Sequence, residues 1–321
     1  MKISLITPAP KRSRAGNRTT AERWASLLRA LGHRVRVAVE YDDEPADVMV
    51  ALHAWRSAGA AMRFHELYPE RKLIVGLGGT DIYVFQKTHP EQTLGTMDAA
   101  DRLVCLHDLV HRNLPRRLHR KLHVIHQSAV PLVRAEEPTR RFFDICVIGH
   151  LREEKDPLRT ALAARLLPAD SAIRILHFGA ARNESWARRG RDEMRRNPRY
   201  HWKGEVPHWR VRKEMGKCRL MVLSSTSEGG ANVISEAVVA GLPVVASRIV
   251  GSVGLLGGDH PGYYPVGNEG ALARVLARCE RDPKFLAALD RRGRRLAPKF
   301  RPEREQRAWR RLLAGLKTGR R

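Results

Sequence analysis

Cysteine is scarce in this chain of 321 residues, and the cysteines that it has stand far apart. Zinc sites and redox motifs need close pairs of cysteines, and no such pair is present. The spacing excludes a cysteine-based metal or redox centre and predicts buried thiols that pack as small apolar side chains. The residues concerned are Cys105, Cys146, Cys218 and Cys279.

Long apolar runs are missing as well. The first residues, MKISLITPAPKRSRAG, contain an apolar stretch of only five residues, which is too short for a signal peptide. No window approaches the ~20 apolar residues of a membrane span. We therefore expect a cytoplasmic protein.

Acidic residues are few, at 34 against 59 lysines and arginines, which gives a net charge of +25. Such a surplus predicts anionic partners, such as nucleotides, phosphates, nucleic acid or a membrane surface. Aromatic residues make up only 6%, and nothing resembles a zinc finger or an RNP sequence. A basic nucleic-acid-binding protein is therefore the less favoured alternative, and we expect no specific nucleic acid.

The sequence does contain short β-rich runs that alternate with helical patterns, which indicates parallel sheets covered on both faces. The chain is also long enough for two domains. A stretch with two prolines and no periodicity, QSAVPLVRAEEPTRR, places the boundary near residue 138, so the predicted domains are 1–138 and 139–321. The second includes a strongly basic C-terminal helix. The runs are KISLI, RVRVAVE, DVMVALH, KLIVGL, RLVCL, KLHVI, FFDICVIG, IRILHFG, RLMVLSS and LPVVAS.

Two glutamates flank a double glycine in SEGGANVISEAVVAGLPVVAS, residues 227–247. Glu228 lies in the loop after a buried strand, and Glu236 lies about one turn into a helix that begins near Ala231, on the side away from the sheet-packing face. The glycines let a ligand approach the backbone, and the first helical amides favour an anionic or hydroxyl-rich partner. Carboxylates accept hydrogen bonds from the hydroxyls of sugars and ribose.

The stretch SSTSEGGANVISEA resembles the signature of the retaining family-4 glycosyltransferases, which have the GT-B fold. The resemblance implies an α/β protein of two doubly wound, Rossmann-like domains facing across a cleft, with the acceptor on the N-terminal side and the nucleotide sugar on the C-terminal side. It also implies that Glu228 contacts the hydroxyls of the donor sugar and that Glu236 holds the ribose. The amides implied to contact sugar and phosphate belong to Gly229, Gly230, Ala231 and Asn232.

Two further stretches are similar to the same family. VIGHLREEKDP implies that Lys155 and Arg152 neutralise the donor diphosphate, with Lys155 also catalytic. His150 stands where the family has an arginine, so whether His150 or Arg152 faces the phosphate is open. DVMVALHAW resembles the family's strand ending in histidine, which implies that His53 approaches the donor sugar. His53 would donate a hydrogen bond while neutral or stabilise negative charge as a cation.

The ensemble ITPAP, GNRTTAERWASLLRALGHRV and GLGGTDIY is most similar to the selenosugar synthases of selenoneine biosynthesis. The implied reaction transfers a hexose from UDP-N-acetylglucosamine or UDP-glucose to selenophosphate, with no cofactor and no metal. The residues implied to bind the acceptor are Gly16, Asn17, Thr80 and Asp81. The cations implied to surround them are Lys11, Arg12, Arg14 and Arg18.

One alternative within the same family is an acceptor in a lipid or other membrane surface. In that case the basic C-terminus would make weak contact with anionic headgroups. The preferred hexose, the anomeric configuration and the oligomeric state stay open at this point.

Overall fold

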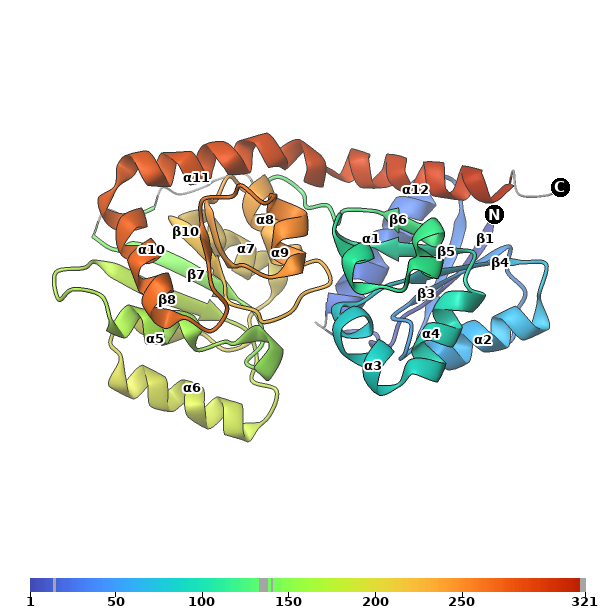
Figure 1. Cartoon of the computed structure of the whole chain (residues 1–321), viewed down its shortest axis with the longest axis horizontal. Coiled ribbons are helices and arrows are strands. Elements are labelled where there is room, and N and C mark those ends of the chain that lie inside the picture. The colour runs from blue at the N-terminus through green and yellow to red at the C-terminus, as the bar shows by residue number, and fades with distance from the viewer. Residues whose placement is uncertain (14–15, 133–137, 140, 318–321) are drawn as a thin grey trace. The chain divides into compact units, whose positions relative to one another are not determined.

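The computed structural model describes residues 1–13, 16–132, 138–139 and 141–317 (Figure 1). The chain divides into two compact units. The first comprises Met1–Ser128, Glu228–Asn232 and Arg301–Arg321, and the second comprises Ala129–Ser227 and Val233–Phe300. The first unit therefore ends earlier than the predicted boundary at residue 138. It also includes the basic C-terminal helix, which we had expected in the domain of residues 139–321.

The first unit is built on a parallel sheet with the strand order β2-β1-β3-β4-β5-β6. Its strands are β1 (Lys2–Ile6), β2 (Arg34–Ala38), β3 (Val48–Leu52), β4 (Lys72–Gly76), β5 (Arg102–Cys105) and β6 (Leu122–Val124). Its helices are α1 (Gly16–Ala30), α2 (Ala58–Leu67), the π-helix η1 (Asp81–Phe85), α3 (Gln86–Thr88), α4 (Pro90–Ala99), the 3-10 helices η2 (Val110–Asn113) and η3 (Arg116–Lys121), and α12 (Pro302–Lys317).

Helices cover both faces of this sheet, which explains why its central strands are apolar on both sides. The burial pattern of β3 is continuous, with all five residues buried. One face packs on α2 and α4 through Phe64 and Met97. The other packs on α1 and α12, where the rings of Trp24 and Trp309 meet edge to face at 4.8 Å between centroids. The C-terminal helix thus completes the core of the first unit.

The second unit has a parallel sheet with the strand order β12-β11-β10-β7-β8-β9. Its strands are β7 (Phe143–Ile148), β8 (Ile173–Phe178), β9 (Tyr200–Trp202), β10 (Leu220–Leu223), β11 (Val244–Ser247) and β12 (Tyr263–Tyr264). Its helices are η4 (Glu153–Lys155), α5 (Arg159–Arg165), α6 (Glu184–Arg196), α7 (His208–Lys217), α8 (Asn232–Val239), α9 (Val250–Leu256), α10 (Glu269–Arg281), α11 (Pro283–Leu296) and η5 (Ala297–Phe300). A core of side chains from the central strands, α5, α10 and α11 fills this unit.

Each β-rich run identified in the sequence forms a strand, and the predicted α/β class with parallel sheets is confirmed. The four cysteines are buried and free, as expected. Burial raises the pKa of Cys105 and of Cys279 to about 12, so neither thiol is a ready nucleophile. Within the described residues, no helix combines the length and apolar character needed to cross a membrane.

Candidate functional site

In the first unit, His53 and Asp81 follow neighbouring strands. The register pairs Leu52 of β3 with Gly76 of β4, so the loops after these strands leave the same edge of the sheet. His53 Nδ1 lies 2.6 Å from Asp81 Oδ1, and His53 Nε2 lies 2.8 Å from Thr80 Oγ1. The side chains of His53 and Asp81 are only 4% and 0% exposed. The structure thus brings three predicted site residues together, but it places the carboxylate of Asp81 inside the protein and not on an acceptor surface.

The double glycine also belongs to the first unit, where it packs on two strand-end loops. A Cβ atom added to Gly229 would lie 2.3 Å from the backbone nitrogen of Gly79. One added to Gly230, whose φ is +143°, would lie 2.3 Å from the Cβ atom of Leu106. Neither position has room for a side chain. Close packing within the protein therefore requires both glycines, a reason that the sequence interpretation had not included.

Glu228 lies near a partly buried tyrosine of η1, Tyr83. Burial raises the pKa of Tyr83 to about 12, and the negative charge of Glu228 adds to the effect. The hydroxyl of Tyr83 lies 3.3 Å from Nε2 of the buried His107. Sequence reasoning missed both residues: Tyr83 ends the stretch GLGGTDIY but was given no role, and His107 belongs to no recognisable motif. Their proximity to the loop arises only from the fold of the first sheet.

The remaining residues of this loop are held by the protein. Ala231 is buried. The side-chain oxygen of Asn232 accepts a hydrogen bond of 3.2 Å from Nη1 of Arg23 on α1. The side chain of Asn232 is thus occupied within the first unit, and its backbone amide is the group that the sequence assigned to the donor.

The N-terminal loop offers a more open surface at the start of α1. Gly16 and Asn17 form the first residues of that helix, and a Cβ atom added to Gly16 would meet no atom within 4 Å. Lys11 and Arg12 are exposed. Of the other predicted cations, Arg18 is buried with its Nε 2.7 Å from Glu22 Oε1, and Arg14 lies outside the described residues.

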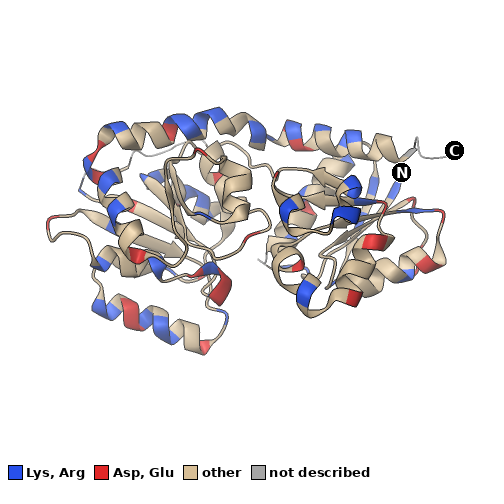
Figure 2. Cartoon of the chain, in the orientation of Figure 1, with Lys and Arg blue, Asp and Glu red and all other residues tan. Residues whose placement is uncertain are grey.

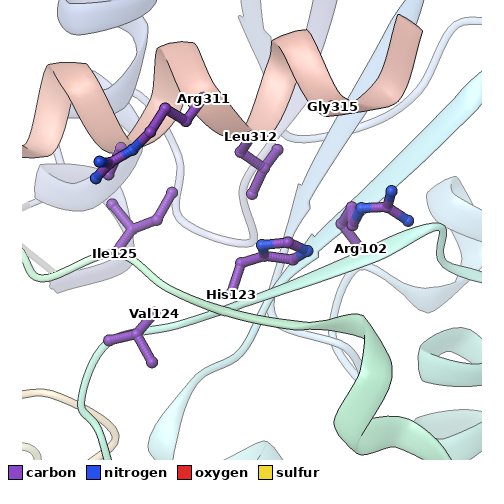
Figure 3. Close-up of a pocket in the computed structure, with 8 residues that line it drawn as sticks. Arg102, His123, Val124, Ile125, Arg311, Leu312 and Gly315 are labelled. Carbon is purple, nitrogen blue, oxygen red and sulfur yellow. The ribbon is translucent and has the colours of Figure 1, made fainter. Parts of the chain in front are cut away.

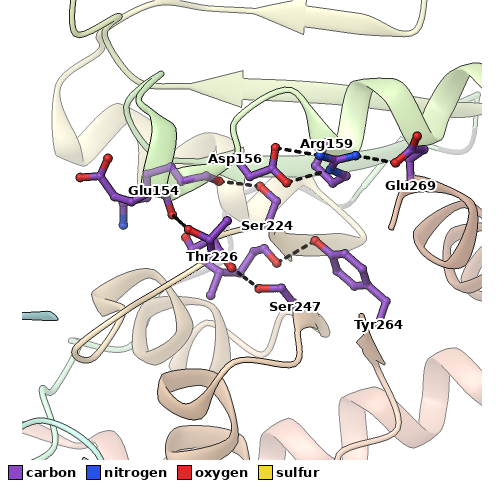
Figure 4. Close-up of polar contacts among 11 residues, drawn as sticks. Glu154, Asp156, Arg159, Ser224, Thr226, Ser247, Tyr264 and Glu269 are labelled. Atoms are coloured by element: carbon purple, nitrogen blue, oxygen red, sulfur yellow. Dashed lines mark hydrogen bonds and ion pairs between the residues drawn. The ribbon is translucent and has the colours of Figure 1, made fainter. Parts of the chain in front are cut away.

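In the second unit, Lys155 ends the short helix η4 that follows β7. Its aliphatic stem passes over Gly149, because a Cβ atom on that glycine would lie 3.8 Å from Cδ of Lys155. Ser224 Oγ donates a hydrogen bond of 3.0 Å to the carbonyl of Lys155. The backbone amide of Thr226 donates one of 2.9 Å to the carbonyl of Glu154 (Figure 4). The serine-rich end of β10 therefore fixes the loop that carries the lysine.

His150 and Arg152 both follow β7, and they differ in charge. Burial lowers the pKa of His150, and the nearby positive charges of Arg152 and Lys155 lower it further. Nδ1 of His150 accepts a hydrogen bond of 3.1 Å from the amide of Ala180. His150 is therefore a neutral link between two loops, whereas Arg152 and Lys155 carry the positive charge. Arg152 also forms an ion pair of 3.2 Å with Glu154.

Glu236, in α8, does not face solvent freely. Its side chain is 12% exposed, and its Oε1 lies 3.0 Å from Nε2 of His208 at the start of α7. This hydrogen bond raises the pKa of His208, against smaller opposing effects of burial and of Arg212. His208 and Glu236 are 28 residues apart along the chain, so their contact cannot be recognised from spacing.

We expect UDP to bind more tightly as the pH rises through the pKa of His208, which lies above the usual 6.5. Protonated His208 competes with ribose hydroxyls for the carboxylate of Glu236, so nucleotide binding releases a proton and gains affinity at higher pH. Calorimetric titration with UDP between pH 5.5 and 8.5 measures this slope. The variant Glu236→Ala should bind UDP about 10- to 100-fold more weakly with the fold intact. The terminal phosphate of UDP also ionises at about pH 6 and contributes to the slope. His208→Ala should therefore reduce the slope, and an equal slope in the variant contradicts the competition.

A cavity of about 320 Å³ lies elsewhere in the first unit, between the sheet edge and α12 (Figure 3). None of the residues predicted for the site lines it. Arg102 and Arg311 lie on opposite sides of His123, and their guanidinium groups point apart, so they do not converge on one anion. The full lining is Arg102, His123, Val124, Ile125, Ala308, Arg311, Leu312 and Gly315.

The sequence from residue 134 to residue 296 matches the family described as Glycosyl transferases group 1. The matched segment is just over half of the chain. The chain belongs to this family. The matched segment contains the loop with Lys155, the double glycine and both glutamates of this glycosyltransferase. No curated protein matches its sequence.

Solved structures of other glycosyltransferase-fold proteins cover nearly the whole chain. HepE from Anabaena, solved in complex with UDP, aligns with a TM-score of 0.78 at 15% identity over 98% of this chain and 100% of its own. Sucrose-phosphate synthase from Thermosynechococcus elongatus gives 0.78 at 15% identity over 98% and 99%. A glycosyltransferase from Rickettsia africae gives 0.74 at 14% identity over 99% of both chains. The expected GT-B fold is confirmed.

Proposed function

We propose that this glycosyltransferase transfers a hexose from UDP-N-acetylglucosamine or UDP-glucose to selenophosphate, in the cytoplasm, as a step of selenoneine biosynthesis. The bond between C1 of the sugar and the diphosphate oxygen breaks, UDP leaves with the electron pair, and the selenium of selenophosphate forms a C1–Se bond. Water then cleaves the P–Se bond, which releases inorganic phosphate and leaves the 1-selenosugar. One observation carries the donor half of the proposal. Arg152 and Lys155 bring positive charge to the loop after β7, beside the neutral His150.

The donor roles follow from this loop and from the glutamates. Lys155 and Arg152 would meet the charge that develops on the leaving diphosphate. Glu236 would hold the ribose, and Glu228 with His53 would contact the hexose. Two HepE structures, one with UDP and glucose and one with UDP-glucose, support a UDP-hexose as the donor class.

The acceptor role rests on the sequence resemblance and on the surface at the start of α1. Selenophosphate is a small polyanion, so it needs cations and free amides. The start of α1 supplies such a surface. Lys11 and Arg12 are exposed, and Gly16, next to Asn17, has open space around it. Thr80 would add a hydroxyl. Asp81 is left out of direct acceptor contact because it is fully buried.

The decisive experiment incubates the purified protein with a panel of nucleotide sugars, with and without selenophosphate, in buffer containing EDTA. We expect consumption of UDP-N-acetylglucosamine or UDP-glucose and a product whose mass corresponds to a 1-selenosugar. Because we propose that no divalent metal takes part, EDTA should leave the rate unchanged. Donors left intact by selenophosphate, together with glycosylation of another acceptor, would remove the selenium assignment and keep the family.

A membrane-surface acceptor is the second candidate, favoured by one feature of α12. Helix α12 carries several exposed arginines, and the Lys and Arg positions along it are coloured blue in Figure 2. Exposed arginines are attracted to anionic headgroups. A lipid acceptor in anionic vesicles therefore belongs in the same panel, and its glycosylation in place of selenophosphate would favour this candidate. The exposed arginines are Arg304, Arg307, Arg310 and Arg311.

A further inference from the structure

We propose that Asp81 is the positioning residue for His53, holding both its backbone conformation and the proton on its ring. The inference rests on the proposed role of His53 at the donor sugar. Three independent features of the first unit carry it: the backbone of His53, the accepting geometry of Asp81 and the short contact between the two side chains.

The backbone of His53 adopts a conformation that side chains rarely take. Its φ is +78°, in the left-handed region. The two amides that follow both point at Asp81, with Ala54 N 2.9 Å from Oδ2 and Trp55 N 3.1 Å from Oδ1. Successive amides after a left-handed residue form a concave site for an anion. Asp81 fills this site, and its carboxylate therefore stabilises the strained turn that presents His53.

The carboxylate of Asp81 acts as an acceptor toward every partner. Besides the amides of Ala54 and Trp55, Oδ2 accepts a hydrogen bond of 2.8 Å from the amide of Gly78. Backbone amides can only donate, so Asp81 joins the loops after β3 and β4 by accepting from both. With a fully buried side chain, it has no exposure through which to bind a substrate directly.

The short contact decides which nitrogen of His53 carries the proton. Asp81 Oδ1 and His53 Nδ1 are 2.6 Å apart, and two acceptors do not approach so closely without a proton between them. The amide of Arg56 lies 3.2 Å from the same Nδ1, but a nitrogen that donates to Asp81 cannot accept from Arg56. The shorter contact determines the state, and Nδ1 is protonated.

The other ring nitrogen of neutral His53 is then an acceptor. Nε2 accepts from the hydroxyl of Thr80 at 2.8 Å, and toward a sugar hydroxyl it would likewise accept. This differs from the expectation from the sequence, in which neutral His53 donates a hydrogen bond to the sugar. Gly78 leaves room for the ring, since a Cβ atom there would lie only 3.2 Å from Cδ2 of His53.

The substitution Asp81→Asn separates positioning from mere packing. Asparagine has one acceptor oxygen, which the amides of Ala54 and Gly78 would take on the Oδ2 side. The amide nitrogen of Asn would then face Nδ1 and donate to it. His53 would switch its proton to Nε2, the tautomer that donates where the native ring accepts.

The test uses the full chain labelled with [15N]histidine, and long-range 1H–15N spectra report the tautomer. The His53 signal is assigned by its loss in His53→Asn. We expect an Nδ1-protonated ring in the unmodified protein and an Nε2-protonated ring in Asp81→Asn. An Nε2-protonated ring in the unmodified protein overturns the proposal, even if Asp81→Asn does not fold. Because no substrate is involved, this outcome is independent of whether the proposed reaction occurs.

Kinetics give the second readout. Asp81→Asn should lower kcat for hexose transfer about 100-fold while KM for the donor changes less than about threefold. The matched control is Asp101→Asn. Asp101 also accepts from a backbone amide, Leu73 N at 2.9 Å, and from Lys72 Nζ, and these partners, unlike those of Asp81, include no histidine. Equal kcat values for Asp81→Asn and Asp101→Asn would overturn the positioning role.

Discussion

Replacing Lys155 by alanine is expected to lower kcat about 10²- to 10³-fold, the effect of removing one preorganised charge from a developing anion. Charge grows on the diphosphate as the bond to the sugar breaks, so the lysine stabilises the transition state more than the bound donor. The affinity for UDP-glucose should therefore fall less than kcat. Steady-state kinetics with isothermal titration of the donor separate the two effects.

Two further variants define the role of Lys155. Lys155→Arg keeps the charge and should retain more activity than the alanine variant. Lys284→Ala removes an exposed lysine on α11 and should have no effect on kcat. The loop itself should survive the alanine substitution, since Ser224 binds the carbonyl of residue 155 and not its side chain. A kcat within threefold of the unmodified enzyme would place the diphosphate charge on another group, with Arg152 the first to examine.

The sequence predicted the strands well because a strand covered on both faces needs a continuous apolar run, which is a local pattern. The sequence did not predict the additional strands β9 and β12. They have three and two residues, and they lie at the two edges of the second sheet. At an edge, one neighbouring strand and the sheet register decide whether a short segment pairs, and neither is a property of the segment itself.

The local placement of the candidate residues was predictable where a motif fixed it, and their partners were unpredictable where these come from distant segments. The loop of Lys155 was recognised from its glycine and lysine, but its anchoring by Ser224 depends on the adjacency of β7 and β10. Glu236 was placed on the side of α8 away from the sheet, and its contact with His208 depends on the position of α7. The same holds for Asp81, whose burial follows from the pairing of β3 with β4.

The return of the C-terminal helix to the first unit is the largest departure from the predicted domains. The sequence predicted a basic helix, and its positive charge suggested contact with anionic headgroups and not a place in a core. The opposite side of α12 carries Trp309, Leu312 and Leu313, all buried in the first core. One acidic residue on that side, Glu305, is also buried, with a side chain that is 0% exposed. A glutamate amid a basic helix gives no local sign that it faces inward.

Glu305→Ala is expected to lower the free energy of unfolding of the first unit by about 3–5 kcal/mol, the effect of removing one partner from a buried charged network. The carboxylate accepts hydrogen bonds from Trp24 Nε1 at 2.9 Å and from the amide of Ser128 at 2.7 Å, and it lies 3.2 Å from Nε of Arg23. Trp24 and Ser128 would lose this acceptor in the interior, and the partly buried Arg23 would lose its ion pair. Thermal unfolding followed by circular dichroism should show a transition about 10 °C lower.

Glu303→Ala is the matched control, because Glu303 is exposed on the same helix and its loss should change stability by about 0.5 kcal/mol or less. An equal effect of the two substitutions would mean that the network does not stabilise the first unit. Arg23 also connects Glu305 to the loop proposed to bind the donor, since Nη1 of Arg23 donates a hydrogen bond to Asn232. When Glu305 is removed, Arg23 loses the carboxylate that orients it. We therefore expect Glu305→Ala to weaken UDP-hexose binding below the unfolding temperature, and Glu303→Ala to leave it unchanged.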